Sequence, residues 1–315
     1  MSDKTSIEWT DATWNPVTGC TKVSPGCDHC YAETFAERWR GTPGHYFEGG
    51  FDLQLRPEKL DQPLRWKRPR RIFVNSMSDV FHEDIDDEYI AQIFAIMSLA
   101  TQHTFQLLTK RHGRMRSLLK RAKDWDPKTR ISWLGVVDNY REAYRPGCGD
   151  FQWPLPNVWL GVSAEDQRWA DIRVPALLDT PAAVRFVSAE PLLGPIDFTC
   201  HLNGICSFCG GSGIGARSAS IGGAKYGPTD CYHCGRGDRP PPALDWVIAG
   251  GESGHGARLM DLEWVRVIRD QCDEAGAAFL YKQQGSGDGG KKSRRELDGR
   301  TWDEFPPDHL TEVPF

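Results

Sequence analysis

Three cysteines lie close together near the start of the chain. Cys20, Cys27 and Cys30 follow the spacing C-x6-C-x2-C, with a Pro-Gly turn between the first and the second. Three thiolates on one short loop can bind three irons of a cubic iron–sulfur cluster and leave the fourth iron open to a ligand. The alternative is a structural zinc site with His29 as fourth ligand, but His29 is crowded between two cysteines of the same tight loop. The spacing therefore favours the cluster.

A second group of four cysteines lies further along the chain in two C-x2-C pairs. The expected ligands are Cys206, Cys209, Cys231 and Cys234. Paired knuckles supply a tetrahedron of thiolates, which predicts zinc, with an auxiliary iron–sulfur cluster as the alternative. The residues between the pairs are rich in glycine and serine, so the metal must hold this segment together. We predict a zinc-ribbon-like module at 197–243, inserted into a core formed by 1–196 and 244–315.

The composition is that of an ordinary globular chain of 315 residues with a net charge of −5. It contains no apolar run of the roughly 18–20 residues that span a bilayer, and its first residues do not resemble a signal peptide. We therefore expect a cytoplasmic protein whose cysteines are thiols or metal ligands. Basic runs at 65–71 and 110–123 are either solvated faces or phosphate-contacting stripes.

Short apolar runs alternate with helical patterns and predict a parallel sheet covered by helices. These runs lie near 15–18 and at 71–74, 105–108, 158–162, 184–187, 246–249 and 278–281. About seven strands are too few for a closed eightfold barrel, so the predicted α/β fold is a partial (β/α) barrel, with a doubly wound open sheet as the alternative. Residues 131–137 resemble 158–162 and predict an extra strand or a small hairpin.

The cysteine loop, closing with Cys-x-x-Cys-Tyr-Ala ahead of a parallel α/β array, resembles the radical S-adenosylmethionine (SAM) superfamily. The chain is also similar to a radical-SAM-like family of phage and bacterial proteins at 7–20, 73–79, 107–111, 159–163, 188–192 and 249–253. This similarity extends over nearly all of the chain outside 138–156 and 197–243. The superfamily has a first cysteine gap of three residues where this chain has six. Its glycine-glycine-glutamate element after the second strand is replaced here by Asn75-Ser76-Met77-Ser78-Asp79.

The resemblance implies an enzyme in which Cys20, Cys27 and Cys30 hold a [4Fe–4S] cluster that binds SAM. A low-potential electron donor would then drive cleavage of SAM, and the 5′-deoxyadenosyl radical would abstract hydrogen from a substrate. The candidates for cofactor binding are Asn75, Ser76, Ser78, Asp79, Ser163 and Ser188, and the candidates for catalytic roles are Glu165, Glu190 and Lys110. Lys110, Arg111 and Lys282 suit a phosphate or carboxylate, so a nucleotide or nucleic-acid base is the expected substrate. A partner encoded by a neighbouring gene is a further expectation.

Two other functions stay open. The first is a non-catalytic, zinc-stabilised protein that binds nucleic acid or a partner and uses Lys120 and Arg121 on its basic run. The second is a metal-dependent hydrolase with Glu165 and Glu190 as its carboxylates, although no histidine-rich ligand set accompanies them.

Overall fold

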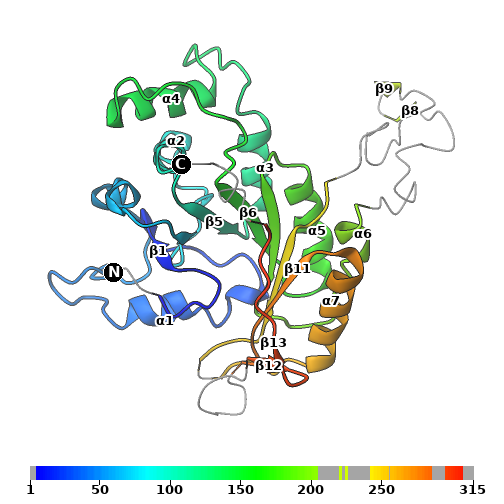
Figure 1. Ribbon diagram of the computed structural model, residues 1–315. Coiled ribbons are helices and arrows are strands. Elements are labelled where there is room, and N and C mark those ends of the chain that lie inside the picture. Colours follow the sequence, from blue (N-terminus) through cyan, green and yellow to red (C-terminus); the bar gives the residue numbers. More distant parts are fainter. Residues whose placement is uncertain are drawn as a thin grey trace.

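A seven-stranded parallel sheet forms the centre of the molecule (Figure 1). The computed structural model describes residues 5–204, 242–254, 256–285 and 295–307, and the backbone of a hairpin formed by β8 (Ser220–Ile221) and β9 (Ala224–Lys225). In spatial order, the strands are β1 (Ala12–Trp14), β4 (Arg71–Val74), β5 (Thr104–Thr109), β6 (Val158–Ser163), β7 (Val184–Ala189), β10 (Trp246–Gly250) and β11 (Ala278–Gln283). The predicted parallel sheet is confirmed.

The first strand begins earlier than expected. Residues 17–18 are not part of the central sheet; they form β2 (Val17–Thr18), which pairs antiparallel with β3 (Gln54–Leu55). Two short 3-10 turns, η2 (Pro57–Lys59) and η3 (Gln62–Arg65), then lead into β4.

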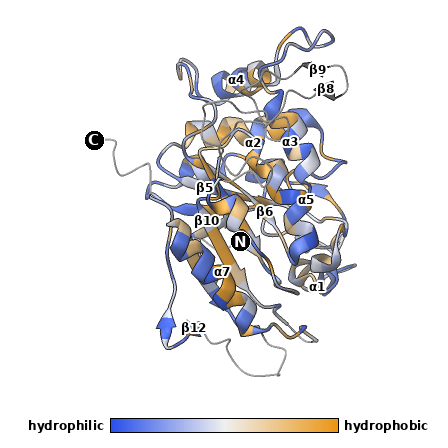
Figure 2. Ribbon diagram, turned by 90° about the vertical axis from the view of Figure 1, so that its right-hand side faces the viewer, coloured by the Kyte–Doolittle hydropathy of each residue, from blue (hydrophilic) through white to orange (hydrophobic). Residues whose placement is uncertain are grey.

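Helices cover the outer face of the sheet. They include α2 (Asp87–Leu99), α3 (His112–Lys120), α5 (Gln167–Leu178) and α7 (Leu262–Ala275). Aspartates at positions 86, 166 and 261 cap α2, α5 and α7, each accepting a backbone N–H from the first turn. Figure 1 shows α5 and α7 on one side of the sheet and α1 (Tyr31–Glu37) on the other, while Figure 2 shows hydrophobic residues concentrated in the strands.

Alternate residues of each strand point to opposite faces of the sheet. In β6, Leu160 and Val162 join the core under the helices, whereas Trp159 points to the inner face. The inner cluster consists of Trp9, Phe73, Trp159, Val184, Phe186, Trp246, Ile248 and Leu280. The ring of Trp9 lies 4.5 Å from that of Phe73 in β4 and 6.2 Å from that of Trp246 in β10, so the sheet curls around these aromatic rings as a half-barrel.

Residues 131–137 do not form the predicted strand or hairpin. They lead into a helix, α4 (Trp133–Tyr144), and the prediction is wrong. The Ser132 hydroxyl caps this helix by accepting the Gly135 N–H at 3.2 Å. Trp133 and Val137, four residues apart, are buried together in the core beside α2, where the Trp133 ring lies 5.2 Å from Phe94. The serine that caps the helix is the local sequence signal for it.

The segment 295–307 returns to the sheet. It contains β12 (Glu296–Leu297) and β13 (Arg300–Thr301), and Asp303 forms an antiparallel bridge with Leu280 of β11. The Phe305 ring lies 5.1 Å from that of Trp246 and closes the aromatic floor of the half-barrel.

The predicted zinc module falls largely outside the described residues, and this includes Cys206, Cys209, Cys231 and Cys234. At its start, α6 (Thr199–Leu202) packs against α7, and the Phe198 N–H donates to Gln271 Oε1 at 2.6 Å. Among the described residues, no helix is both long and apolar enough to cross a membrane.

Candidate functional site

The cysteine loop, residues 19–30, runs along the carboxyl edge of the sheet. It begins at Gly19, which forms a parallel bridge with Ser78 and donates its N–H to Met77 O at 2.9 Å. Gly19 has φ +86°, and a Cβ built there would lie 2.1 Å from the carbonyl oxygen of Asp52. Only glycine fits this position, so the chain is committed to the path that places Cys20 beside the segment after β4.

The segment after β6 supports the middle of the loop. Glu165 Oε1 accepts the Gly26 N–H at 3.2 Å, and Oε2 accepts from Arg173 Nη1 of α5 at 2.8 Å. Both side chains are fully buried. Because both oxygens of Glu165 are occupied by the protein, the geometry gives this residue a role in placing the loop.

The segment after β10 holds the end of the loop. His29 Nδ1 lies 2.9 Å from Glu252 Oε2, and Arg258 donates to Glu252 Oε1 at 2.6 Å and to Pro25 O at 2.8 Å. Burial favours a higher pKa for Glu252, but Arg258 and His29 outweigh it and hold that pKa below its ordinary value. Sequence reasoning missed these contacts, although the Gly-Gly-Glu element ending at Glu252 was the available signal.

The segment after β5 holds the beginning of the loop. Arg111 Nη2 donates to Thr21 Oγ1 at 2.6 Å, and His82 Nε2 lies 2.9 Å from the same hydroxyl. Arg111 also forms an ion pair with Glu83. The ends of β5, β6 and β10 thus anchor three points of one loop, and the segment after β4 contributes Ser78 at Gly19 and His82 at Thr21.

Each cysteine of the loop has a cationic residue near it. The charge of Arg111 acts on Cys20 and that of Lys110 acts on Cys30, and Arg173 lies close enough to Cys27 to feel its charge. Cys20 precedes the 3-10 turn η1 (Pro25–Cys27), and Cys27 is the last residue of that turn. Cations of this kind favour thiolates, which are the forms that bind metals.

Burial works against ionisation of the free thiols. It raises the pKa of Cys20 to about 11, with Asp79 acting in the same direction and Arg111 in the opposite one. It also raises the pKa of Cys30, opposed by the backbone amides of Glu33 and Ala32. Thiolates at this site would therefore need the charge of a bound metal as well as that of the neighbouring cations.

Within the described ranges, no three His, Cys, Asp or Glu side chains are grouped closely enough to hold one metal ion. The ligands of a single zinc converge within about 2.3 Å of one point. Cysteines that bind different irons of a cluster need not converge in this way. Cys27 nonetheless acts electrostatically on both Cys20 and Cys30, so its sulfur lies within electrostatic range of the other two.

The inner face of the half-barrel changes from apolar to polar toward the loop. Side chains alternate between the two faces along each strand, so every second residue after an aromatic or aliphatic side chain of the inner cluster also points to the inner face. At the carboxyl edge these residues are Asn75, Lys110, Ser163, Ser188 and Lys282. Ser163 and Ser188 lie opposite each other in the register of β6 and β7. Most of the polar residues expected from the sequence therefore lie together at the carboxyl edge of the half-barrel, which forms its mouth.

Asn75 is the least satisfied of these residues. It has φ 60°, in the left-handed region that non-glycine residues rarely adopt, and it is only 2% exposed. Neither Nδ2 nor Oδ1 has a hydrogen-bond partner among the described residues. A strained, buried amide with two unused polar atoms is suited to binding a ligand.

The other three polar residues after β4 are used by the fold. Ser76, Ser78 and Asp79 hydrogen-bond to other segments, and their partners are, in order, Asn15, Val17 and the pair Thr109 and Lys110. Asp79 accepts the Thr109 hydroxyl at 2.7 Å and the Lys110 N–H at 3.0 Å, so it joins the ends of β4 and β5. Asn75 is left as the residue of this segment with polar atoms to offer.

An ion pair lies at the opposite side of the mouth. Lys282 Nζ at the end of β11 pairs with Glu190 Oε1 directly after β7, and both side chains are largely buried. In the part of the chain that the structure describes, no carboxylate pairs with Lys110, so its ammonium adds positive charge to the mouth.

Comparison with known proteins places the chain in a family. A family model described as "Protein of unknown function (DUF5131)" matches residues 4–306. The chain belongs to the DUF5131 family. The match includes the whole cysteine loop and each of the segments that anchor it. No match was found for this DUF5131 chain among curated proteins or among solved structures.

The basic helix of this DUF5131 chain is neutralised in part by its own fold. Arg116 Nε and Lys120 Nζ both lie within 2.8 Å of Asp179 at the end of α5. These ion pairs leave less free charge for the phosphate-contacting stripe that the basic run at 110–123 suggested.

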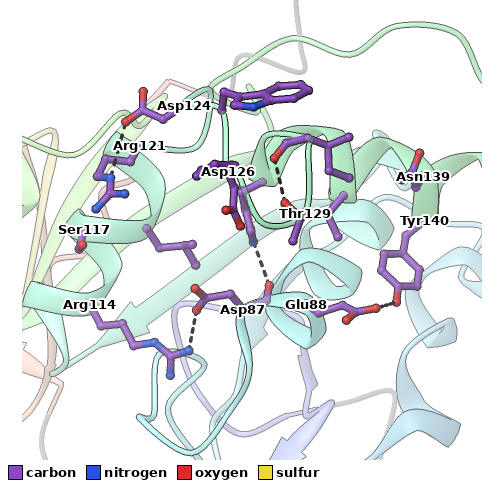
Figure 3. A pocket seen from close by; sticks show the side chains of 16 residues that line it. Asp87, Glu88, Arg114, Ser117, Arg121, Asp124, Asp126, Thr129, Asn139 and Tyr140 are labelled. Carbon is purple, nitrogen blue, oxygen red and sulfur yellow. Dashed lines mark hydrogen bonds and ion pairs between the residues drawn. The ribbon is translucent and has the colours of Figure 1, made fainter.

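A pocket of about 620 Å³ lies between α2, α3, α4 and the segment that joins α3 to α4 (Figure 3). Both arginines that line it are paired with carboxylates, Arg114 with Asp87 and Arg121 with Asp124. None of its lining residues belongs to the cysteine loop. The pocket of the DUF5131 chain is thus separate from the mouth of the half-barrel.

Proposed function

We propose that this chain is a radical SAM enzyme that binds a [4Fe–4S] cluster at Cys20, Cys27 and Cys30. The observation that carries the proposal is the anchoring of one three-cysteine loop by three strand ends at the mouth of a parallel half-barrel. A loop fixed in this way can present a cofactor at the carboxyl edge of the barrel, where α/β enzymes place their sites.

The donor set supports a cluster. Three soft thiolates carried by one short loop suit iron–sulfur chemistry, in which each cysteine binds a different iron. His29, the fourth ligand of the zinc alternative, hydrogen-bonds through Nδ1 to Glu252. The cations beside each cysteine would offset the negative charge of the thiolates.

When bound, the cluster would supply reductive cleavage of SAM, using one electron from a low-potential donor and yielding methionine and a 5′-deoxyadenosyl radical. The protein's own residues would bind and orient the ligands. The Asn75 amide would hydrogen-bond to SAM, and Ser163 and Ser188 would offer hydroxyls on the inner face. The aromatic floor beneath them excludes water.

We propose that the substrate is a nucleotide or a base within a nucleic acid, whose phosphate supplies a negative charge. Lys110 and Lys282 lie at the ends of β5 and β11, on the inner face of the mouth, and Glu190 accompanies Lys282 as a candidate acid or base. An ammonium without a carboxylate partner among the described residues favours a phosphate or carboxylate at Lys110.

Anaerobic reconstitution tests the proposal. The purified chain should bind about four irons and four sulfides at the loop, as expected for one [4Fe–4S] cluster. It should turn brown and release 5′-deoxyadenosine when reduced with SAM present. Cys27→Ala should abolish the colour of this site and the product, whereas Cys148→Ala, which removes a thiol away from the loop, should change neither. A wild-type chain that binds zinc at the loop and no iron would overturn the proposal.

A further inference from the structure

A buried ion pair lies directly beneath the cysteine loop. Glu165 links it to the loop through the Gly26 N–H, and Gly26 immediately precedes Cys27. A Cβ at Gly26 would lie only 3.2 Å from Glu165 Cδ, so the loop and the carboxylate are in close contact. Arg173 is therefore separated from the backbone next to Cys27 by a single carboxylate.

Stability alone does not explain this pair. Burying two charges carries a penalty of several kcal/mol per ion, and apolar residues of similar volume are often equally stabilising or more so. Arg173 also keeps two donor atoms, Nε and Nη2, without hydrogen-bond partners among the described residues. The ring of Trp169 lies 4.1 Å from its Cζ and holds the guanidinium in place. A fixed, buried cation with unused donors is suited to act on a negative charge beside it.

We propose that Arg173 and Glu165 set the reduction potential of the cluster held by the cysteine loop, Arg173 raising it and Glu165 lowering it. This inference rests on the proposed function. Reduction adds one electron to the cluster, and that electron comes from the low-potential donor. A buried positive charge nearby stabilises the reduced form and a buried negative charge disfavours it, because charges interact strongly where water is excluded. The two residues act as positioning and tuning groups that touch neither SAM nor substrate.

Variants that remove one charge at a time test the inference. Arg173→Met removes the positive charge, Glu165→Gln removes the negative charge but keeps an oxygen for the Gly26 N–H, and Arg173→Lys retains the charge. The midpoint potential of each reconstituted protein is measured by anaerobic redox titration followed by electron paramagnetic resonance, after its iron and sulfide have been counted. We expect a lower potential for Arg173→Met, a higher one for Glu165→Gln, and a value near wild type for Arg173→Lys.

A matched control separates tuning from loss of structure. Arg141 is also buried, pairs with Asp138 and lies 4.4 Å from the ring of Phe151, but it belongs to α4, outside the anchors of the loop. Arg141→Met should leave the potential unchanged. If Arg173→Met loads no cluster, the opposite shift in Glu165→Gln still decides. Shifts in the same direction, or none, in a wild-type-like cluster would overturn only this inference, whereas a wild-type chain without iron would overturn the proposed function with it.

Discussion

His29 Nδ1 lies 2.9 Å from Glu252 Oε2, so a residue of the cysteine loop is bonded to a carboxylate 223 positions further along the chain. Glu252 also receives the backbone N–H and the guanidinium of Arg258, which itself reaches the carbonyl of Pro25. This contact closes the loop against the end of β10. The loop is therefore part of the tertiary structure and not a local metal-binding turn.

Glu252→Ala should loosen the loop. It leaves Arg258 and His29 without their shared partner, and we expect the free energy of unfolding to fall by about 1–3 kcal/mol. Iron retained after desalting should fall as well. Glu263→Ala, which removes an exposed carboxylate paired with Arg266, is the control and should retain full iron. Unchanged iron in the Glu252 variant would show that this contact does not support the site.

Asn75→Gly should raise the free energy of unfolding and weaken the binding of SAM. Glycine adopts φ 60° without strain and removes the two unpartnered amide atoms, so we expect the free energy of unfolding to rise by about 1 kcal/mol. Loss of one ligand hydrogen bond should weaken SAM binding by about tenfold. Calorimetry measures both quantities. Arg130→Gly, at a similar φ of 61° and away from the loop, should gain stability without a change in SAM affinity.

Gly19→Ala should prevent the loop from forming. Its Cβ would overlap the Asp52 carbonyl at 2.1 Å, in addition to the strain of φ +86°. We expect a loss of more than about 3 kcal/mol in the free energy of unfolding, together with loss of iron binding. Gly41→Ala has a comparable φ of +75° but open space around the added carbon, and it should lose only about 1 kcal/mol. Equal losses in both variants would contradict the close approach.

The contact between α3 and α5 should weaken in acid. Burial favours a higher pKa for Asp179, but Lys120 and Arg116 outweigh it and hold that pKa below its ordinary value of 3.8. The folded state therefore gains stability from this group above about pH 4 and loses it as the pH falls through the lowered pKa. Asp179→Asn should lower the free energy of unfolding at pH 7 by about 0.2–1 kcal/mol.

Thermal unfolding of wild type and Asp179→Asn at pH 7 and at pH 3 measures this effect. The difference between the two proteins should shrink at the lower pH. The control is Asp150→Asn, at an exposed position, and it should track wild type at both values. A difference that persists or grows at pH 3 would contradict the sign of the shift.

The sheet was predictable because its strands are short, fully buried apolar runs that end in polar residues. The helix at α4 was also predictable, because Trp133, Val136 and Val137 have the i, i+3, i+4 spacing of a helix face and Ser132 precedes them as a cap. Local signals could not reveal that Glu165 would be paired with Arg173 or that Asn75 would adopt a left-handed conformation. Those features depend on contacts between segments far apart in sequence.

The tryptophan and phenylalanine rings inside the half-barrel bear on where a ligand could reach its inner face. Trp9 and Phe305 arrive from segments outside the seven strands and pack against Trp246, so aromatic rings fill the amino-terminal half of the half-barrel. In the proposed enzyme, ligands would therefore reach the inner face from the carboxyl edge, past the cysteine loop. A ligand already bound at that edge would then decide which others could follow it.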